Sequence, residues 1–217
     1  MDAGDTIDLS TGYLTAKAPA HIGEGARAAL DRSETHHVDR LGIKPLREVI
    51  AATLARDGIP NVTADNVLVT SGAQEALFIA LRALVEPNDE TFMPDPGYRL
   101  IETLAELDEE NFVPVTSTVN DFEITAQSYA AAITPKSRYL VVLSPTPATC
   151  GMIAPKEFAK LLALAEQINL VILYDAALSG GIYAPMADLN FANGLPDRVL
   201  WIGSVSKFYR MSGWRIG

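Results

Sequence analysis

Cysteine and histidine are scarce in this chain. Its 217 residues include one cysteine, Cys150, and three histidines. A single cysteine excludes an internal disulfide framework, and so few sulfur and imidazole ligands leave little material for a metal site. Cys150 itself is expected to be a small buried residue rather than a nucleophile. The sequence therefore predicts no bound metal.

Positive charge is also in the minority. The chain has 17 basic and 27 acidic residues, a net charge of −10 at neutral pH, which argues against a nucleic-acid-binding surface. No apolar run approaches the length of a membrane span. The acidic start, Met1-Asp-Ala-Gly-Asp, lacks the basic residues of a signal peptide. These absences predict a cytoplasmic protein that binds neither nucleic acid nor membrane.

Apolar residues are plentiful, at 48% of the chain, which is enough for one large domain or one and a half. Continuous apolar runs alternate with helical patterns from residue 66 onward, and this rhythm is typical of a sheet buried on both faces. We therefore expect an α/β fold with three layers around a mostly parallel, doubly wound sheet. The expected strands cover 66–70, 91–93, 112–115, 139–143, 170–174 and 199–202, and helices are expected from Pro19, over 45–56, 71–85 and 157–168, and ending near 107 and 133.

Polar and small residues follow most of these strands. In doubly wound sheets ligands bind beyond the carboxyl ends of the strands. Loops are polar in any case, so each feature has a plain alternative. The segments that follow the strands are Ser71-Gly-Ala-Gln, Pro94-Asp-Pro-Gly-Tyr, Ser144-Pro-Thr-Pro, Asp175 and Gly203-Ser-Val-Ser-Lys.

The residue types in these segments suit a cofactor with an aldehyde and a phosphate. The amine of Lys207 can form a Schiff base, and neighbouring hydroxyls with Arg215, two helical turns on, can hold a phosphate. Ser71-Gly-Ala-Gln at a helix start offers backbone N–H groups to an anion, although it is also an ordinary N-cap. Asp175 ends an apolar strand and needs a cationic or proton-bearing partner, either a ring nitrogen or a structural network. Tyr98 could stack on a ring or belong to the core.

The last stretch, Ser204-Val-Ser-Lys-Phe-Tyr-Arg-Met-Ser-Gly-Trp-Arg-Ile-Gly, closely resembles the cofactor-lysine motif of class I/II aminotransferases of the aspartate-aminotransferase fold. The resemblance covers essentially the whole chain, in the family's order. It continues through Gly42-Ile-Lys-Pro-Leu-Arg-Glu, Val69-Thr-Ser-Gly-Ala-Gln-Glu-Ala-Leu, Pro94-Asp-Pro-Gly-Tyr and the segment from Ser144-Pro to Pro155. It implies the large domain of a transferase dependent on pyridoxal 5′-phosphate, with its sheet incomplete at the C-terminus.

The resemblance also implies a role for each matched residue. Lys207 would carry the cofactor as an internal aldimine and, once released, move the substrate's α-proton. Asp175 would pair with the pyridinium nitrogen and keep the ring an electron sink. Tyr98 would stack on the ring, and Gly12 falls where the family's entry loop lines the substrate pocket. The phosphate would be held by Gly72, Ala73, Gln74, Ser204, Ser206 and Arg215.

Two departures from the family pattern concern the cofactor's phenolic oxygen. The family's usual asparagine donor is replaced by Pro147, and its usual tyrosine donor by Leu178. Such donors stabilise the phenolate near neutral pH, so their loss predicts altered cofactor electronics or a substitute donor. The tyrosine that usually reaches the neighbouring subunit's phosphate aligns with His37, which is either a donor or a solvated loop residue.

The resemblance implies an organisation and a function. Residues 1–50 would form the N-terminal segment and part of a small domain, and residues 51–217 an incomplete cofactor-binding large domain, with the C-terminal small domain absent. The expected activity is amino-group transfer between an amino acid and a 2-oxo acid, in a homodimer when full length. The alternatives are a lyase, decarboxylase or oxidase of the same fold acting on an amino acid, or an inactive fragment or cofactor-sensing protein.

Overall fold

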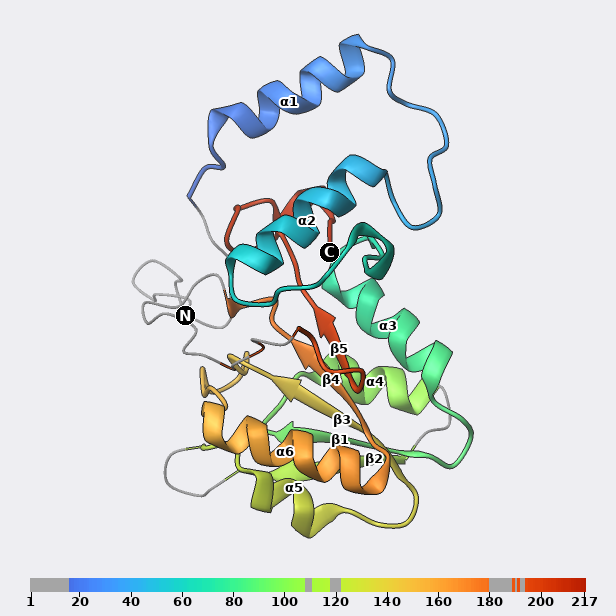
Figure 1. Ribbon diagram of the computed structural model, residues 1–217, viewed down its shortest axis with the longest axis vertical. Helices are drawn as coiled ribbons and strands as arrows, with labels where there is room; N and C mark the ends of the chain where they lie inside the picture. The colour runs from blue at the N-terminus through green and yellow to red at the C-terminus, as the bar shows by residue number, and fades with distance from the viewer. Residues whose placement is uncertain (1–15, 108–110, 118–121, 180–188, 190, 192–193) are drawn as a thin grey trace, which may run out of the picture.

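The computed structural model describes residues 16–107, 111–117, 122–179, 189, 191 and 194–217 (Figure 1). Its centre is a sheet of five strands in the order β2-β1-β3-β4-β5, and every neighbouring pair is parallel. This confirms the α/β fold with a parallel sheet. The strands are β1 (Glu90–Asp95), β2 (Asn111–Thr116), β3 (Ser137–Leu143), β4 (Val171–Asp175) and β5 (Val199–Ile202).

Helices cover both faces of the sheet. On one face α3 (Ala73–Leu84) and α4 (Arg99–Leu107) pack on a core cluster that includes Met93, Val141 and Leu173. On the other, α5 (Ala126–Ala132) and α6 (Pro155–Ile168) pack on Leu140, Ile172 and their neighbours (Figure 1). Alternate residues of the same strand thus face opposite helix layers, which is why β3 and β4 read as continuous apolar runs.

Two prolines lie inside strands without disrupting the sheet. Pro94 belongs to β1, which runs two residues beyond its expected end at Met93. The pairing of β1 with β3 ends at Phe92, so Pro94 lies past that ladder, and the missing N–H costs no bond on that side. Pro114 lies in β2, an edge strand of the sheet, where proline is tolerated.

Residues 66–70 do not form the expected strand. The 3₁₀ turn η2 (Ala64–Asn66) precedes an extended segment that lies outside the five-stranded sheet. In this segment the Val69 N–H donates to the Leu41 carbonyl at 2.9 Å, and Thr70 exchanges two backbone hydrogen bonds with Gly217. A β-branched run predicts extended backbone, but it does not specify whether a full ladder of partners will be present.

Two helices precede this α/β unit. Helix α1 (Ala20–Asp31) begins after Pro19, as expected, and has no buried residue. Figure 1 places it at the top of the view, beyond α2 (Lys44–Arg56). Helix α2 buries Arg47 and Ala51. No helix among the described residues is long and apolar enough to cross a membrane.

Candidate functional site

The carboxyl ends of three neighbouring strands lie side by side. Leu143 of β3 pairs with Asp175 of β4, and Asp175 pairs with Ile202 of β5. The backbone continues this alignment, since Ser144 N–H donates to the Asp175 carbonyl at 3.2 Å. The segments that follow these strands, including the one with Lys207, therefore start from the same edge of the sheet, as the strand-end rule predicts.

Asp175 is a buried carboxylate at this edge. Its residue is 9% exposed, and its Oδ1 accepts a hydrogen bond from the Ala177 N–H at 2.8 Å. Burial raises the pKa of its carboxyl from 3.8 to about 6, although the Ala177 bond acts in the opposite direction. No cation among the described residues forms an ion pair with it. A positive or proton-bearing group next to this carboxylate would therefore stabilise its buried charge.

The start of α3 offers backbone donors. Gly72 is the N-cap residue, with a φ of +86° that favours glycine. Its carbonyl accepts from the N–H groups of Glu75 and Ala76 and from the Thr70 hydroxyl. The N–H groups of Ala73 and Gln74 meet no acceptor among the residues that the structure describes. This helix end can bind an anion.

Arg215 lies against the same helix end. Its Nη2 donates to the Ser71 carbonyl at 3.2 Å, and its Nη1 donates to the Ser212 carbonyl at 3.0 Å. A Cβ on Gly72 would collide with the guanidinium, so this close approach also requires glycine. A guanidinium beside N–H groups that meet no acceptor in the described part of the chain is an arrangement typical of anion sites.

The last residues of the chain join β5 to the segment before α3. Thr70 N–H donates to the Gly217 carbonyl at 2.9 Å, and Gly217 N–H returns a bond to Thr70 at 3.0 Å. On the other side, Val205 N–H and the Ser204 hydroxyl both donate to the Ile216 carbonyl, at 3.2 and 3.4 Å. Thr70 and Ser204 are far apart in sequence, but both form hydrogen bonds with residues 216–217.

Lys207 is half-buried in the turn after β5. Ser206 N–H donates to the Ser204 hydroxyl at 3.1 Å, and Arg210 N–H donates to the Lys207 carbonyl at 3.2 Å. The helical spacing expected between Lys207 and Arg215 is wrong. Turns and the 3₁₀ segment η4 (Ser212–Trp214) separate them, and Arg215 has a left-handed φ of +53°. Gly213 inside this segment disfavours a regular helix.

Tyr98 and Gln74 approach each other from different segments. Tyr98 is half-buried after the turn that follows β1, and its phenolic oxygen accepts a 2.6 Å hydrogen bond from the Gln74 amide nitrogen Nε2. Sequence reasoning missed this pairing. It also missed Glu75, whose carboxylate accepts from the Ser71 N–H. Glutamate three residues after an N-cap is a known helix-start pattern, so a signal for Glu75 was present.

Three other positions were singled out from the sequence. Gly12 falls outside the described residues. His37 is exposed in the loop between α1 and α2. Cys150 is exposed rather than buried, because it occupies a surface turn with a left-handed φ of +57°.

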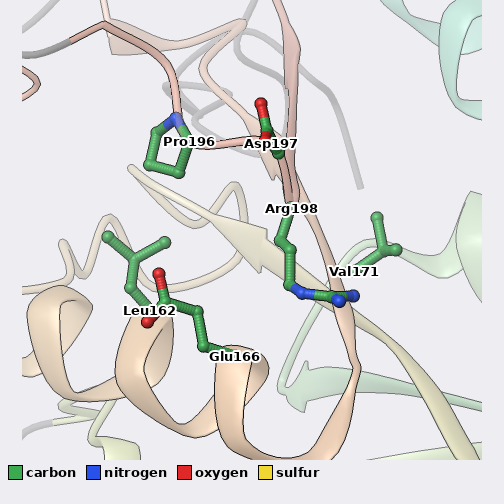
Figure 2. A pocket seen from close by; sticks show the side chains of 6 residues that line it. All are labelled: Leu162, Glu166, Val171, Pro196, Asp197 and Arg198. Atoms are coloured by element: carbon green, nitrogen blue, oxygen red, sulfur yellow. The ribbon is translucent and has the colours of Figure 1, made fainter.

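One hollow among the described residues lies away from this edge. A space of about 420 Å³ lies at the amino ends of β4 and β5, between α6 and residues 196–198 (Figure 2). Figure 2 shows Leu162 and Glu166 on α6 facing this space, with Arg198 beside them. Charges of both signs line it, and none of the expected site residues does. The expected site residues Asp175 and Lys207 lie at or after the opposite, carboxyl ends of these two strands.

The sequence pattern of the family "Aminotransferase class I and II" matches residues 4–217. The chain belongs to this family. A similar relative is a probable aspartate aminotransferase of Methanocaldococcus jannaschii, 35% identical over 100% of this chain and 57% of that protein. Another is a probable N-acetyl-LL-diaminopimelate aminotransferase of Bacillus subtilis, 29% identical over 98% of this chain and 54% of that protein.

A solved aminotransferase has the same fold. The structure of a double mutant of Thermus thermophilus aspartate aminotransferase superimposes with a TM-score of 0.90 at 27% identity, and covers 96% of this chain and 55% of that one. The chain therefore spans just over half the length of the relatives and the structure that it matches.

The two departures from this aminotransferase family follow the paired ends of β3 and β4. Pro147 is exposed in the segment after β3, and Leu178 is half-buried three residues after Asp175. Hydroxyls nearby are already engaged. Thr146 donates to the Leu143 carbonyl at 3.1 Å, and Ser179 donates to the Ala176 carbonyl at 2.7 Å. Neither replacement supplies a side-chain donor.

Proposed function

We propose that this protein transfers an amino group between an amino acid and a 2-oxo acid, with pyridoxal 5′-phosphate held at Lys207. The observation that carries the proposal is the alignment of the Asp175 strand end with the Lys207 segment, together with a helix end whose first N–H donors meet no acceptor among the described residues. The family membership and the relatives named as aminotransferases support it.

The residues present fit this cofactor on physical grounds. Asp175 is buried without a cationic partner among the described residues, which suits a protonated ring nitrogen. The N–H groups of Ala73 and Gln74, the cleared space at Gly72 and the guanidinium of Arg215 suit a phosphate. Ser204 and Ser206 lie between Arg215's segment and Lys207 and would add hydroxyl donors.

When bound, pyridoxal phosphate supplies an electron sink for the bond that breaks at the substrate's α-carbon. Lys207 would hold the cofactor through its amine, and that amine, once the substrate's own amine has displaced it, would accept and return the α-proton. Asp175 would keep the ring nitrogen protonated, since a buried carboxylate is stabilised by a positive neighbour. Tyr98 would lie against the ring, and Gly12 would line the substrate side.

A second candidate is a lyase, decarboxylase or oxidase acting on an amino acid through the same cofactor. The observation that favours it is the pair Pro147 and Leu178, which removes both expected donors to the phenolic oxygen. A changed charge at that oxygen alters how strongly the ring withdraws electrons, and hence which bond breaks.

We further propose that residues 1–50 form the N-terminal segment and part of a small domain and that residues 51–217 belong to the cofactor-binding large domain. We also propose that the full-length protein is a cytoplasmic homodimer. The names of two relatives contain aspartate and N-acetyl-LL-diaminopimelate. The substrate of this chain is proposed only as an amino acid with a 2-oxo acid acceptor.

Two measurements test the proposal. Purified protein mixed with pyridoxal phosphate should develop the visible absorbance of a lysine-bound cofactor, and Lys207→Ala should not. Identical spectra for the two proteins would refute the site. Incubation with amino acids and a 2-oxo acid then separates the candidates. Amino-group transfer supports the first, whereas ammonia, carbon dioxide or peroxide supports the second.

A further inference from the structure

Gln74 and Tyr98 meet through their side chains at the edge of the proposed site. Gln74 is the second residue of α3, and Tyr98 directly precedes α4. The 2.6 Å hydrogen bond between Gln74 Nε2 and the phenolic oxygen joins the two helices at their starts. It links the helix end proposed for the phosphate to the ring proposed to stack on the cofactor.

The rest of Tyr98 is held independently of Gln74. Its carbonyl accepts from the Ile101 N–H at 2.9 Å, and its side chain packs against the core cluster shared by α3 and α4. The turn before it is tight, because a Cβ on Gly97 would collide with the Pro94 carbonyl. The hydroxyl end of the ring is therefore the part whose position depends on Gln74.

The two halves of Gln74 have different partners. Its backbone N–H meets no acceptor among the described residues and faces the helix end where an anion would bind. Its side-chain amide is engaged with Tyr98. A side chain that held the phosphate would have to give up this bond.

We propose that the Gln74 side chain is a positioning residue for the cofactor ring, acting through the Tyr98 hydroxyl rather than on the phosphate. The inference rests on the proposed function and deepens it. It predicts that Gln74 affects ligands that carry the pyridine ring, whether or not they carry a phosphate.

Binding of three probes separates the ring from the phosphate. Pyridoxal phosphate and pyridoxal are titrated by quenching of tryptophan fluorescence, and inorganic phosphate is measured as a competitor of pyridoxal phosphate. Gln74→Leu should weaken pyridoxal and pyridoxal phosphate by the same factor, about threefold to tenfold for one lost hydrogen bond. The inhibition constant of inorganic phosphate should stay unchanged.

Companion variants test the route through Tyr98. Tyr98→Phe should weaken both ring ligands as Gln74→Leu does, and the double variant should be no weaker than either one. Gln74→Glu cannot donate to the Tyr98 oxygen, but its carboxylate can accept a hydrogen bond from the Tyr98 hydroxyl, so it should keep pyridoxal binding while its charge weakens the binding of pyridoxal phosphate. Gln127→Leu is the matched control, because Gln127 is exposed at the second position of α5.

The outcomes are distinguishable. Loss of pyridoxal phosphate and inorganic phosphate affinity in Gln74→Leu, with pyridoxal unaffected, would overturn the inference and leave the proposed function standing. Additive losses in the double variant would overturn it as well. Failure of the unmodified protein to bind either ring ligand would overturn the proposed function. In that case the tyrosine ring signals of labelled protein still report the contact, and unchanged Tyr98 signals in Gln74→Leu would contradict it.

Discussion

Two buried charges in this molecule have opposite surroundings. Arg47 of α2 is 6% exposed and donates to the carbonyls of Gly42 and Ala64, at 3.0 and 2.8 Å, with Asp39 and Asp65 at 4.0 and 3.7 Å. Asp175 is 9% exposed and has one backbone donor and no cation among the described residues. A charge that the chain neutralises itself has a structural role, whereas a buried charge without a counter-charge among the described residues is typical of a binding site.

Removal of the satisfied charge should have the largest effect on stability. Arg47→Ala removes the guanidinium hydrogen bonds to the half-buried carbonyls of Gly42 and Ala64, of which the second keeps the Val67 N–H as a donor, and it separates α2 from η2. Because both lost bonds come from a charged group, we expect a loss of about 3–5 kcal/mol in the free energy of unfolding. Urea denaturation measures it. Arg47→Lys keeps the charge but cannot reach both carbonyls in the same geometry, and should lie between. A loss below about 1 kcal/mol for Arg47→Ala would break the comparison.

Removal of the Asp175 charge should instead increase the free energy of unfolding. The folded chain raises the pKa of Asp175 from 3.8 to about 6, so ionisation favours the unfolded state. The free energy of unfolding should therefore fall as the pH rises through this range and stay level above it. Without cofactor at pH 8, Asp175→Asn should gain up to about 3 kcal/mol and lose this pH dependence.

The same variant should bind cofactor poorly, because an amide cannot stabilise a protonated ring nitrogen as a carboxylate does. Urea denaturation from pH 4 to 8 with and without pyridoxal phosphate checks both statements. Asp175→Asn protein that is less stable than the unmodified chain at pH 8 would show that the carboxylate has a structural partner after all.

Displacement of a second arginine, Arg215, should have a smaller effect on stability than loss of Arg47. Arg215 is exposed and bonds two carbonyls, with no carboxylate of the described residues within ion-pair distance. Gly72→Ala would displace its guanidinium and strain a backbone with a φ of +86°, at a cost of about 1–2 kcal/mol. Pyridoxal phosphate binding should weaken more than pyridoxal binding, as titration of both ligands would reveal. Equal weakening would place Arg215 outside the phosphate site.

Local sequence pattern was sufficient for the framework of the fold. Residues 139–143 of β3 and 171–174 of β4 are continuous apolar runs because both faces of the sheet are covered, and Asp175 stands out as a carboxylate at the end of such a run. The position of Lys207 after β5 followed from the same rule for strand ends.

Long-range contacts were not predictable in this way. The pair Thr70–Gly217 joins residues at opposite ends of the α/β unit, and the bond from Gln74 to Tyr98 depends on how α3 and α4 pack. The spacing of Lys207 and Arg215 along the chain predicted helical turns between them, but the structure has turns and a 3₁₀ segment there. Such features depend on tertiary packing, which a residue's sequence neighbours do not encode.

Lys207 is proposed to be the amine that holds the cofactor. Incubation with pyridoxal phosphate, reduction with borohydride and peptide mapping by mass spectrometry test this role directly, since reduction fixes the cofactor to its lysine. We expect modification of Lys207 at stoichiometric cofactor, and its loss in Asp175→Asn at the same concentration. Modification spread over exposed lysines such as Lys156 and Lys160, with Lys207 unmodified, would contradict it.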